Sequence, residues 1–558
     1  MTTAVTEMRQ PAALAADMGV PAAMLEPYGD GVAKIKLEAA DALQAHQLAK
    51  YVLMTAVTPT PFGEGKTVTA IGLGDGLRHI GRRAVVTLRQ SSMGPTFGVK
   101  GGGAGGGRSR LVPFDRVLLQ LTGDMHAVTS AHNLLAAMFD NHLFHGNPLG
   151  IDASSVTWPR VLDIDDRALR NIVIGLGGHE DGIPRQAGFE ITAASEVMAI
   201  LALCSSLQDL RERLGRIVVG TTLDGEPVTA ESLRAAGAMA VIMRDAVKPN
   251  LVQTAEGTPV LVHAGPFGNI AHGNSSVIAD RFAIHGADVV VTEAGFGADM
   301  GAERFFNIKC RVSGLRPDAA VIVATVRALK VHSGKYHVAS GHGLPAELGE
   351  EHPEDVVAGA VNLERQVDNV RRHGIPAVIA INAMPADHPS EVAAVAEVST
   401  AMRAHAVVST SYADGGAGAA ELAEAVLDAA DQRGGFTFLY PDSMPLEQKI
   451  VTVAREMYGA AGVEFAPTAR GALERCERDG YGRLPICIAK THLSLSHDPA
   501  LVGAPSGYML PIHDVHVSAG AGFVYALAGD VTTMPGLPTH PAAEHVDVDQ
   551  NGNPIGLF

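Results

Sequence analysis

The chain has 558 residues, of which 47% are hydrophobic and 18% are charged, and its formal net charge is −17 at pH 7. This length and apolar content predict several folding units with large buried cores. The acidic balance argues against a nucleic-acid partner, which would need a basic surface stripe. We also expect no membrane span, because no run of about 18 apolar residues occurs. With no secretory pattern at the start, a cytoplasmic protein is expected.

The four cysteines are too far apart to indicate a zinc site or a disulfide framework. None of them belongs to a Cys-x-x-Cys pair. A reducing compartment fits this usage. The cysteines are Cys204, Cys310, Cys476 and Cys487.

Residues 51–78 have the layout of a phosphate-binding loop between a strand and a helix. An apolar, β-branched run at 51–57 predicts a buried strand, and helical spacing follows from Val68. The intervening loop ends in Gly-Lys-Thr, although a threonine replaces its usual first glycine. Lys66 would reach the β- and γ-phosphates of ATP and Thr67 would bind Mg²⁺; the alternative is an ordinary turn with a surface lysine. The residues expected to hold the nucleotide are Thr60, Pro61, Phe62, Gly63, Glu64, Gly65, Lys66 and Thr67.

A second predicted strand, at residues 82–88, ends on Arg89. Ligands of open α/β sheets bind beyond the carboxyl ends of the strands, so Arg89 would lie near the phosphates if the two strands are neighbours. Otherwise it is a surface arginine. A glycine run follows, flanked by Lys100 and Arg108. It is either a flexible linker or a loop that approaches a ligand closely, and the flanking cations favour the ligand loop.

Asp124 and His126 stand at the start of a long predicted helix that runs to Phe144. Asp124 is a plausible helix N-cap. It could equally supply a carboxylate to a Mg²⁺ shell, with His126 as a polar group beside the reacting acid. The sequence leaves both interpretations open.

Apolar strands alternate with helices along most of the chain, which predicts an α/β fold with a mainly parallel, doubly wound, P-loop NTPase-like sheet and additional α/β domains. We expect a nucleotide-binding domain over residues 1–365, mainly helical in its first 50 residues, with an internal subdomain at about 150–290. A second domain at 366–435 would contribute to an acceptor pocket, and 436–558 would form a C-terminal α/β domain. The predicted strands are Ile172–Ile174, Ile217–Val219, Val260–Val262, Val289–Val291, Val321–Val323, Val378–Ile381 and Ile486–Ile488.

The chemistry indicated by these residues is phosphoryl transfer to a small acid. Arg89, Lys100 and Arg108 suit an anion held beside the γ-phosphate of ATP. We see no convincing apolar strand ending in Asp, the mark of hydrolysis-coupled motors, and no nucleophilic Ser–His or Cys–His pair. Phosphoryl transfer needs positioning and charge neutralisation more than covalent help from the protein. The residues alone predict an ATP-dependent ligase or kinase, in which an acyl phosphate is captured by an amine.

The loop at 58–67 resembles that of formate–tetrahydrofolate ligases, and the similarity continues through Gly94–Gly102, Lys248–Thr254, Ala324–Lys330 and Met534–Pro538. These matches span nearly the whole chain. The resemblance implies that formate and ATP give formyl phosphate, which is then attacked by N10 of tetrahydrofolate. It further implies Mg²⁺, a stimulating monovalent cation such as K⁺ or NH₄⁺, and a homo-oligomer, either a tetramer or a dimer.

The resemblance also implies roles for individual residues. Lys66 and Thr67 would hold the ATP phosphates and Mg²⁺, while Arg89 would hold the formyl-phosphate anion. Lys100 and His126 would line the same pocket. Small-molecule substrates are therefore the expected partners.

The departures from this family gather on the folate side of the expected site. Gln90 replaces a glutamate, Arg108 a tyrosine, Met384 a phenylalanine and Tyr412 a tryptophan. The replaced Phe and Trp sandwich the pterin ring, so stacking worth about 0.5–1.5 kcal/mol per pair would be weakened. Three interpretations stay open: a ligase with a looser folate pocket, the same chemistry with another amine acceptor or another small acid, and a nucleotide-binding regulator without turnover.

Overall fold

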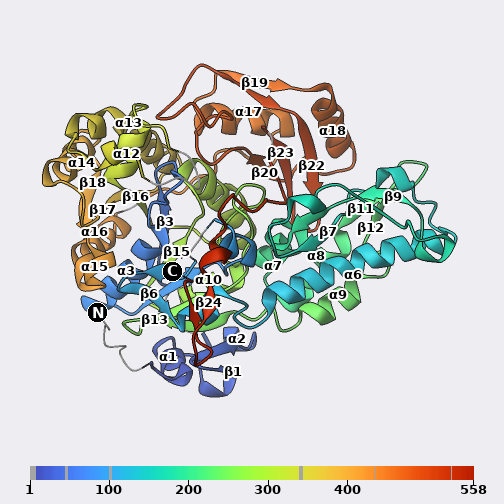
Figure 1. The fold of residues 1–558 in the computed structure, drawn as a ribbon, viewed down its shortest axis with the longest axis horizontal. Coiled ribbons are helices and arrows are strands. Elements are labelled where there is room, and N and C mark those ends of the chain that lie inside the picture. Colours follow the sequence, from blue (N-terminus) through green and yellow to red (C-terminus); the bar gives the residue numbers. More distant parts are fainter. Residues whose placement is uncertain are drawn as a thin grey trace.

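A computed structural model of the chain describes residues 8–43, 48–99, 103–338, 344–432, 434–529 and 531–557. Its centre is a 12-stranded sheet, which confirms the predicted α/β class (Figure 1). Two strands, β5 (Gly105–Gly106) and β6 (Ser109–Val112), branch from β13. The other ten follow one another as β1 (Leu25–Gly29), β2 (Val32–Ile35), β13 (Asn250–Thr254), β14 (Pro259–Val262), β4 (Ala84–Leu88), β15 (Val289–Glu293), β3 (Lys50–Ala56), β16 (Ala319–Ala324), β17 (Ala377–Asn382) and β18 (His405–Ser409).

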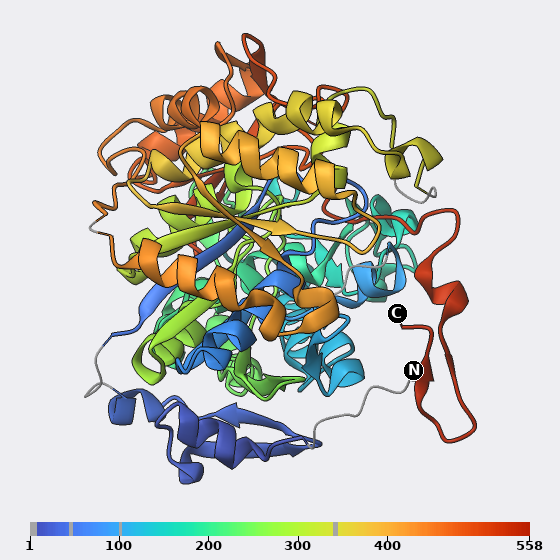
Figure 2. The same cartoon turned by 90° about the vertical axis from the view of Figure 1, so that its left-hand side faces the viewer.

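All strands from β14 to β18 are parallel, whereas β1, β2 and β13 run antiparallel to their neighbours. The prediction that residues 1–50 are mainly helical is therefore wrong for 25–35. That hairpin pairs with β13 and buries Lys34 completely, because the sheet edge supplies partners that a local pattern does not reveal. Figure 2 shows this segment (dark blue) and the orange part of the chain beyond residue 436 at opposite ends of the molecule.

Helices cover both faces of the parallel sheet, as expected for a doubly wound fold. Val52 and Met54 of β3 pack on the side of α3 (Lys66–His79) and α16 (Ala420–Ala430). Tyr51 and Leu53 pack on the opposite side, with α10 (Val277–Gly286), α13 (Pro353–Arg371) and α14 (Pro389–Ala401). This alternation follows from the period of two in a strand and accounts for the uninterrupted apolar run in the sequence.

Residues 145–249, here called the inserted segment, leave the sheet after α6 (Asp124–Phe144) and return at β13. The expected strand at 172–174 forms here, but Val173 is 54% exposed in a small antiparallel hairpin, so the prediction that it is buried is wrong. The elements are α7 (Glu196–Leu203), α8 (Leu207–Arg216), α9 (Ala236–Met243), β7 (Arg160–Leu162), β8 (Ile172–Ile174), β9 (Arg185–Ala187), β10 (Phe189–Ile191), β11 (Val218–Thr221) and β12 (Pro227–Thr229).

Residues from about 436 onward form a separate core around Ile450, Leu473 and Ile488. By contrast, β17 and β18 of the expected 366–435 domain extend the central sheet, so no change of sheet marks a boundary near residue 365. The C-terminal elements are α17 (Leu446–Glu456), α18 (Pro467–Arg478), β19 (Gly462–Phe465), β20 (Ile486–Ala489), β21 (Met509–Ile512), β22 (Asp514–Ser518) and β23 (Phe523–Leu527).

Candidate functional site

The loop between β3 and α3 is held in shape by buried hydrogen bonds. The Glu64 side chain is 1% exposed, and its carboxylate accepts hydrogen bonds from the backbone N–H and the hydroxyl of Thr60, at 2.7 and 3.0 Å. It also accepts one from the Thr325 hydroxyl at 2.9 Å. Thr60, the residue that replaces the usual glycine, therefore fixes the loop from inside. The side chains of Thr60 and Glu64 thus bond to each other and shape the loop.

Gly65 begins α3 and is required by both its conformation and its surroundings. Its φ is +75°, in the left-handed region that favours glycine. A Cβ atom there would stand 2.3 Å from Nδ2 of Asn382. That amide donates a hydrogen bond to the Glu64 carbonyl at 3.0 Å, which ties the end of β17 to the loop. The N-terminus of α3 is thus fixed where its free N–H groups can receive phosphates.

Lys66, Thr67, Arg89 and Glu293 come together at the carboxyl ends of three strands. The Thr67 hydroxyl donates to the Glu293 carboxylate, at 3.0 and 3.2 Å from its two oxygens. β15, which ends in Glu293, lies between β3 and β4. β3 and β4 are therefore not neighbours, so the condition under which Arg89 was expected near the phosphates is not met. Arg89 nevertheless lies near Lys66, because one intervening strand separates them by only about 10 Å.

Burial and mutual repulsion make this pair of cations a receptor for an anion. Burial lowers the pKa of Lys66, Glu293 and Glu64 raise it, and Arg89 lowers it further. Burial also lowers the pKa of Arg89, and Glu293 opposes that effect. No carboxylate among the described residues lies within ion-pair distance of Lys66 or Arg89, and Arg89 donates only to the Pro266 carbonyl, at 3.0 Å. A bound polyanion would relieve this excess of positive charge.

Asp124 belongs to a buried ion pair. Its side chain pairs with Lys34 of β2 at 2.9 Å and accepts from the Asn250 amide of β13 at 2.7 Å. The N-cap of α6 is Gly123, with no side-chain cap, so the interpretation of Asp124 as an N-cap is wrong. Both carboxylate oxygens of Asp124 serve to fix α6 to the sheet.

His126 lies two residues further along α6, with an exposed side chain near Asp163. Burial raises the pKa of Asp163, and His126 acts in the opposite direction. The Asp163 carboxylate accepts from the Ser92 hydroxyl at 2.6 Å and from the Met93 N–H at 3.0 Å. His126 is thereby placed beside the loop that carries Arg89.

Tyr412 and Arg108 meet at the glycine-rich hairpin of β5 and β6. The Arg108 N–H donates to the Tyr412 carbonyl at 2.9 Å. A Cβ at Gly107 would stand 2.2 Å from the Tyr412 carbonyl oxygen and 2.9 Å from the Tyr412 ring. Glycine is therefore required for the hairpin to pack this closely against Tyr412. Residues 105–106 pair with 109–110 in an ordered hairpin, so this part of the glycine run is not a flexible linker. Lys100, on the other flank, lies outside the described residues.

Met384 and Tyr412 follow the ends of the adjacent parallel strands β17 and β18. The Met384 N–H donates to Asp387 at 2.8 Å. Gln90 is buried in the loop after β4, and its amide nitrogen has no partner among the described residues. Gln90 and Met384 thus lie in loops at the carboxyl edge of the sheet, Tyr412 lies in the short helix α15 (Ser411–Asp414) that follows β18, and Arg108 lies on the hairpin beside α3.

Two parts of the site were missed in the sequence. Glu293 ends the apolar strand Val289–Glu293, and the sequence left open whether this carboxylate contacts Mg²⁺. Phe296 and His492 stack with ring centroids 4.6 Å apart. Burial lowers the pKa of His492 to about 4, with Lys490 and Lys66 adding to the shift. His492, Lys490 and Thr491 line a cavity of about 600 Å³ on the C-terminal side of the site.

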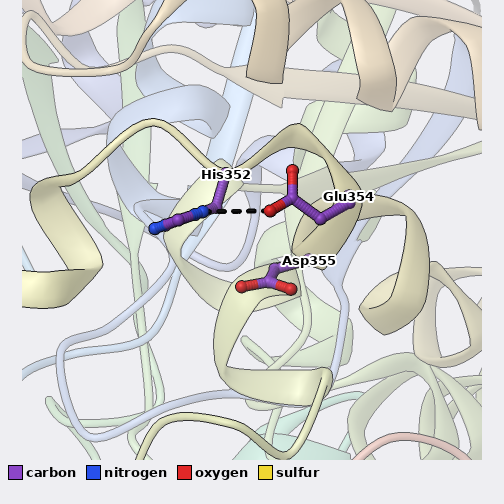
Figure 3. Close-up of side chains that lie close together, drawn as sticks. All are labelled: His352, Glu354 and Asp355. Carbon is purple, nitrogen blue, oxygen red and sulfur yellow. Dashed lines mark hydrogen bonds and ion pairs between the residues drawn. The ribbon is translucent and has the colours of Figure 1, made fainter.

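A group of possible metal ligands near the start of α13 is better explained as a structural anchor. His352, Glu354 and Asp355 lie within reach of one another (Figure 3). His352 is already bonded to Glu354 at 3.0 Å, and the Asp355 carboxylate is taken by Lys335 and by the Tyr336 hydroxyl. Glu354 and Asp355 thus already have hydrogen-bond or ion-pair partners, and we assign no metal there.

Comparison with known proteins decides the family. The profile described as "Formate--tetrahydrofolate ligase" matches residues 2–558. The chain belongs to this family. It is 62% identical over 543 residues to formate–tetrahydrofolate ligase 3 of Rubrobacter xylanophilus, covering 96% of this chain and 95% of that one. It is 61% identical over 552 residues to the ligase of Saccharopolyspora erythraea, covering 99% and 98%, and 57% identical over 545 residues to that of Cutibacterium acnes, covering 98% and 97%.

The resemblance found in the sequence is thus confirmed at family level. Within the described residues, no helix is both long and apolar enough to cross a membrane.

Proposed function

We propose that this chain uses ATP to activate formate as formyl phosphate and then transfers the formyl group to N10 of tetrahydrofolate. The observation that carries the proposal is the meeting of Lys66, Arg89 and the Thr67–Glu293 pair at the carboxyl edge of the sheet. The names of relatives at 55–62% identity support formate and tetrahydrofolate as the substrates.

The nucleotide would bind with its phosphates on the loop of 60–67. Backbone N–H groups at the start of α3 would contact the phosphates, and Lys66 would neutralise the β- and γ-phosphate charge. The base and ribose would occupy the cavity of about 600 Å³ that His492 lines, since the His492 ring stacks on Phe296 and lies close enough to Lys66 for the lysine charge to lower its pKa. This cavity is within the usual size for a bound small molecule.

Mg²⁺ would be held by the Thr67 hydroxyl and by Glu293, directly or through water. Their oxygens already lie 3.0 Å apart, and hydroxyl and carboxylate oxygens are the ligands this hard cation prefers. When bound, the ion would neutralise charge on the transferred phosphoryl group.

In the first step a formate oxygen attacks the γ-phosphorus, and the bond to the β-phosphate oxygen breaks to release ADP. Arg89 would orient formate and the transferred group, and Lys66 would stabilise the charge spread over the equatorial oxygens. In the second step N10 of tetrahydrofolate attacks the formyl carbon, loses its proton, and phosphate leaves. His126 and Lys100 are expected to line this pocket, so His126 is a candidate to accept that proton.

The acceptor would lie over the loops after β17 and β18, between Met384 and Tyr412, with Gln90 and Arg108 nearby. We favour a folate pocket with weakened stacking. Another amine acceptor, another small acid, or a regulator without turnover are less favoured, because the relatives are named for tetrahydrofolate and the cationic pair is complete.

The direct test is ADP release by the purified chain with Mg²⁺-ATP and formate, with and without tetrahydrofolate, together with detection of 10-formyltetrahydrofolate. Equal amounts of ADP and formyl-folate are expected. ATP binding without formyl-folate at millimolar tetrahydrofolate would overturn the acceptor assignment, and no ATP consumption with any acid or amine would favour the regulator.

We also propose a homo-oligomer, a tetramer or a dimer, that works in the cytoplasm and is stimulated by K⁺ or NH₄⁺. Light scattering during gel filtration tests the oligomer. Activity in K⁺, NH₄⁺ and Na⁺ buffers of equal ionic strength tests the cation.

A further inference from the structure

A second cavity, of about 530 Å³, lies between the inserted segment and the C-terminal unit. Its walls come from α6, α7 and β11 on one side and from α18, β22 and β23 on the other (Figure 1). Val531 lines both this cavity and the one beside His492, but neither Lys66 nor Arg89 reaches it. The reaction proposed above makes no use of this space.

The cavity carries an excess of negative charge. Glu190 and Glu196 both line it, and burial raises the pKa of each to about 7. Among the described residues that line it, Arg475 is the only Lys or Arg, and Asp479 offsets its charge. At pH 8 the cavity would therefore hold two carboxylates, with Arg216 offsetting part of the charge of Glu196.

The histidines that line the cavity do not supply the missing positive charge. Burial lowers the pKa of His132 to about 4 and also lowers the pKa of His516. Both imidazoles are therefore neutral near physiological pH. Arg216 lies near enough to Glu196 to oppose the effect of burial on its pKa, whereas no cation among the described residues acts on Glu190, and a ligand could supply that charge.

Aromatic faces complete the walls. Tyr525 stacks on His516 at 5.1 Å between ring centroids, and Trp158 stacks on His132 at 4.1 Å. The Tyr525 hydroxyl has no hydrogen-bond partner among the described residues. Its pKa is raised by burial and then by Glu190 and Glu196, so it lies near both carboxylates. Aromatic faces attract organic cations, and carboxylates form charge-assisted hydrogen bonds with ammonium groups.

We propose that this cavity binds a small organic ammonium ion, of the size of a short aliphatic diamine. Its ammonium groups would pair with Glu190 and Glu196, and its alkyl chain would pack on the rings of Tyr525 and Trp158. A bare metal ion fits less well, because the cavity is of the size that usually accepts a whole organic molecule. The rings also offer no ligand atoms to a metal ion.

Isothermal titration calorimetry of the full chain at pH 8 tests the proposal with 1,4-diaminobutane, against the neutral 1,4-butanediol. We expect the diamine to bind at least 10-fold more tightly than the diol. Glu190→Gln should weaken diamine binding by 10-fold or more. Glu226→Gln removes the same charge from an exposed position beside β12 and should leave the dissociation constant unchanged.

Glu196→Gln is the second variant. Glu196 accepts backbone hydrogen bonds from Gly520 and Ala521, at 2.7 and 3.2 Å, and glutamine keeps an accepting oxygen for them. Glu196→Gln should also weaken binding of 1,4-diaminobutane by 10-fold or more, with an unchanged melting temperature. Equal binding of diamine and diol, or undiminished binding by Glu190→Gln, would overturn the proposal. Neither readout depends on ligase activity.

Discussion

The phosphate side and the acceptor side of the site are built differently. Around the phosphate loop, Thr60, Glu64 and Asn382 are buried and bonded to one another across β3, β16 and β17. On the acceptor side, Tyr412 is 45% exposed and Arg108 is exposed. A change on the first side disturbs several buried hydrogen bonds, whereas Tyr412 and Arg108 can change without disturbing the core. Departures from the family are therefore tolerated at these two exposed positions, and the buried Gln90 is the exception.

The strongest test of the phosphate side is Lys66→Ala. We expect kcat/KM for ATP to fall by about 1,000-fold, because the cation that stabilises the transferred phosphoryl group is lost. Coupled ADP release measures the effect. Lys36→Ala is the control, since this surface lysine donates only to the Ala23 carbonyl and should keep full activity. Retained turnover in Lys66→Ala would contradict the assignment of residues 60–67 as the phosphate-binding loop.

Glu293→Gln removes the charge that faces both cations and the Thr67 hydroxyl. The expected result is a loss of about 10- to 100-fold in activity and a higher Mg²⁺ concentration for half-maximal rate. Thr67→Ser keeps the hydroxyl and should stay close to the original rate. A Mg²⁺ titration of both variants makes the comparison, and an unshifted curve for Glu293→Gln would remove Glu293 from the metal site.

Two glycines of the same loop provide a matched pair for stability. Gly63 and Gly65 have φ of +74° and +75°, but a Cβ at Gly63 meets nothing within 4 Å, whereas one at Gly65 meets Asn382. Gly63→Ala should cost about 1 kcal/mol of unfolding free energy from backbone strain alone. Gly65→Ala should cost about 2 kcal/mol or more. Urea unfolding of the two variants measures the difference, and equal costs would contradict the proposed contact with Asn382.

The smallest effect is expected on the acceptor side. Met384→Phe combined with Tyr412→Trp should tighten tetrahydrofolate binding by about 2- to 10-fold, since one aromatic pair contributes about 0.5–1.5 kcal/mol. Fluorescence titration gives the dissociation constant, and ATP binding serves as the internal control because it should not change. If tetrahydrofolate binds no better, these two residues do not contact the pterin.

Much of the fold could be predicted because each strand carries its own signal. The run before the phosphate loop became β3, and the strands predicted at 260–262, 289–291, 321–323 and 378–381 all lie in the central sheet. The hairpin at 25–35 forms around a local turn at Asp30–Gly31 that was not recognised in the sequence, and its attachment to β13, more than 200 residues away, could not be predicted from a local pattern. The strand at 172–174 was predicted to be buried, but Val173 is exposed, because an apolar strand can also lie at the surface.

For the site, the sequence by itself determined the phosphate loop, Lys66, Thr67 and the family resemblance, because these depend on residues close together in the chain. Only the tertiary structure decided the role of the two acids. Glu293 reaches Thr67 because β15 lies between β3 and β4. Asp124 pairs with Lys34 because β2 pairs with β13, which places Lys34 opposite Asn250, the other partner of Asp124. Strand order is set by contacts between distant segments, and a local pattern carries no record of it.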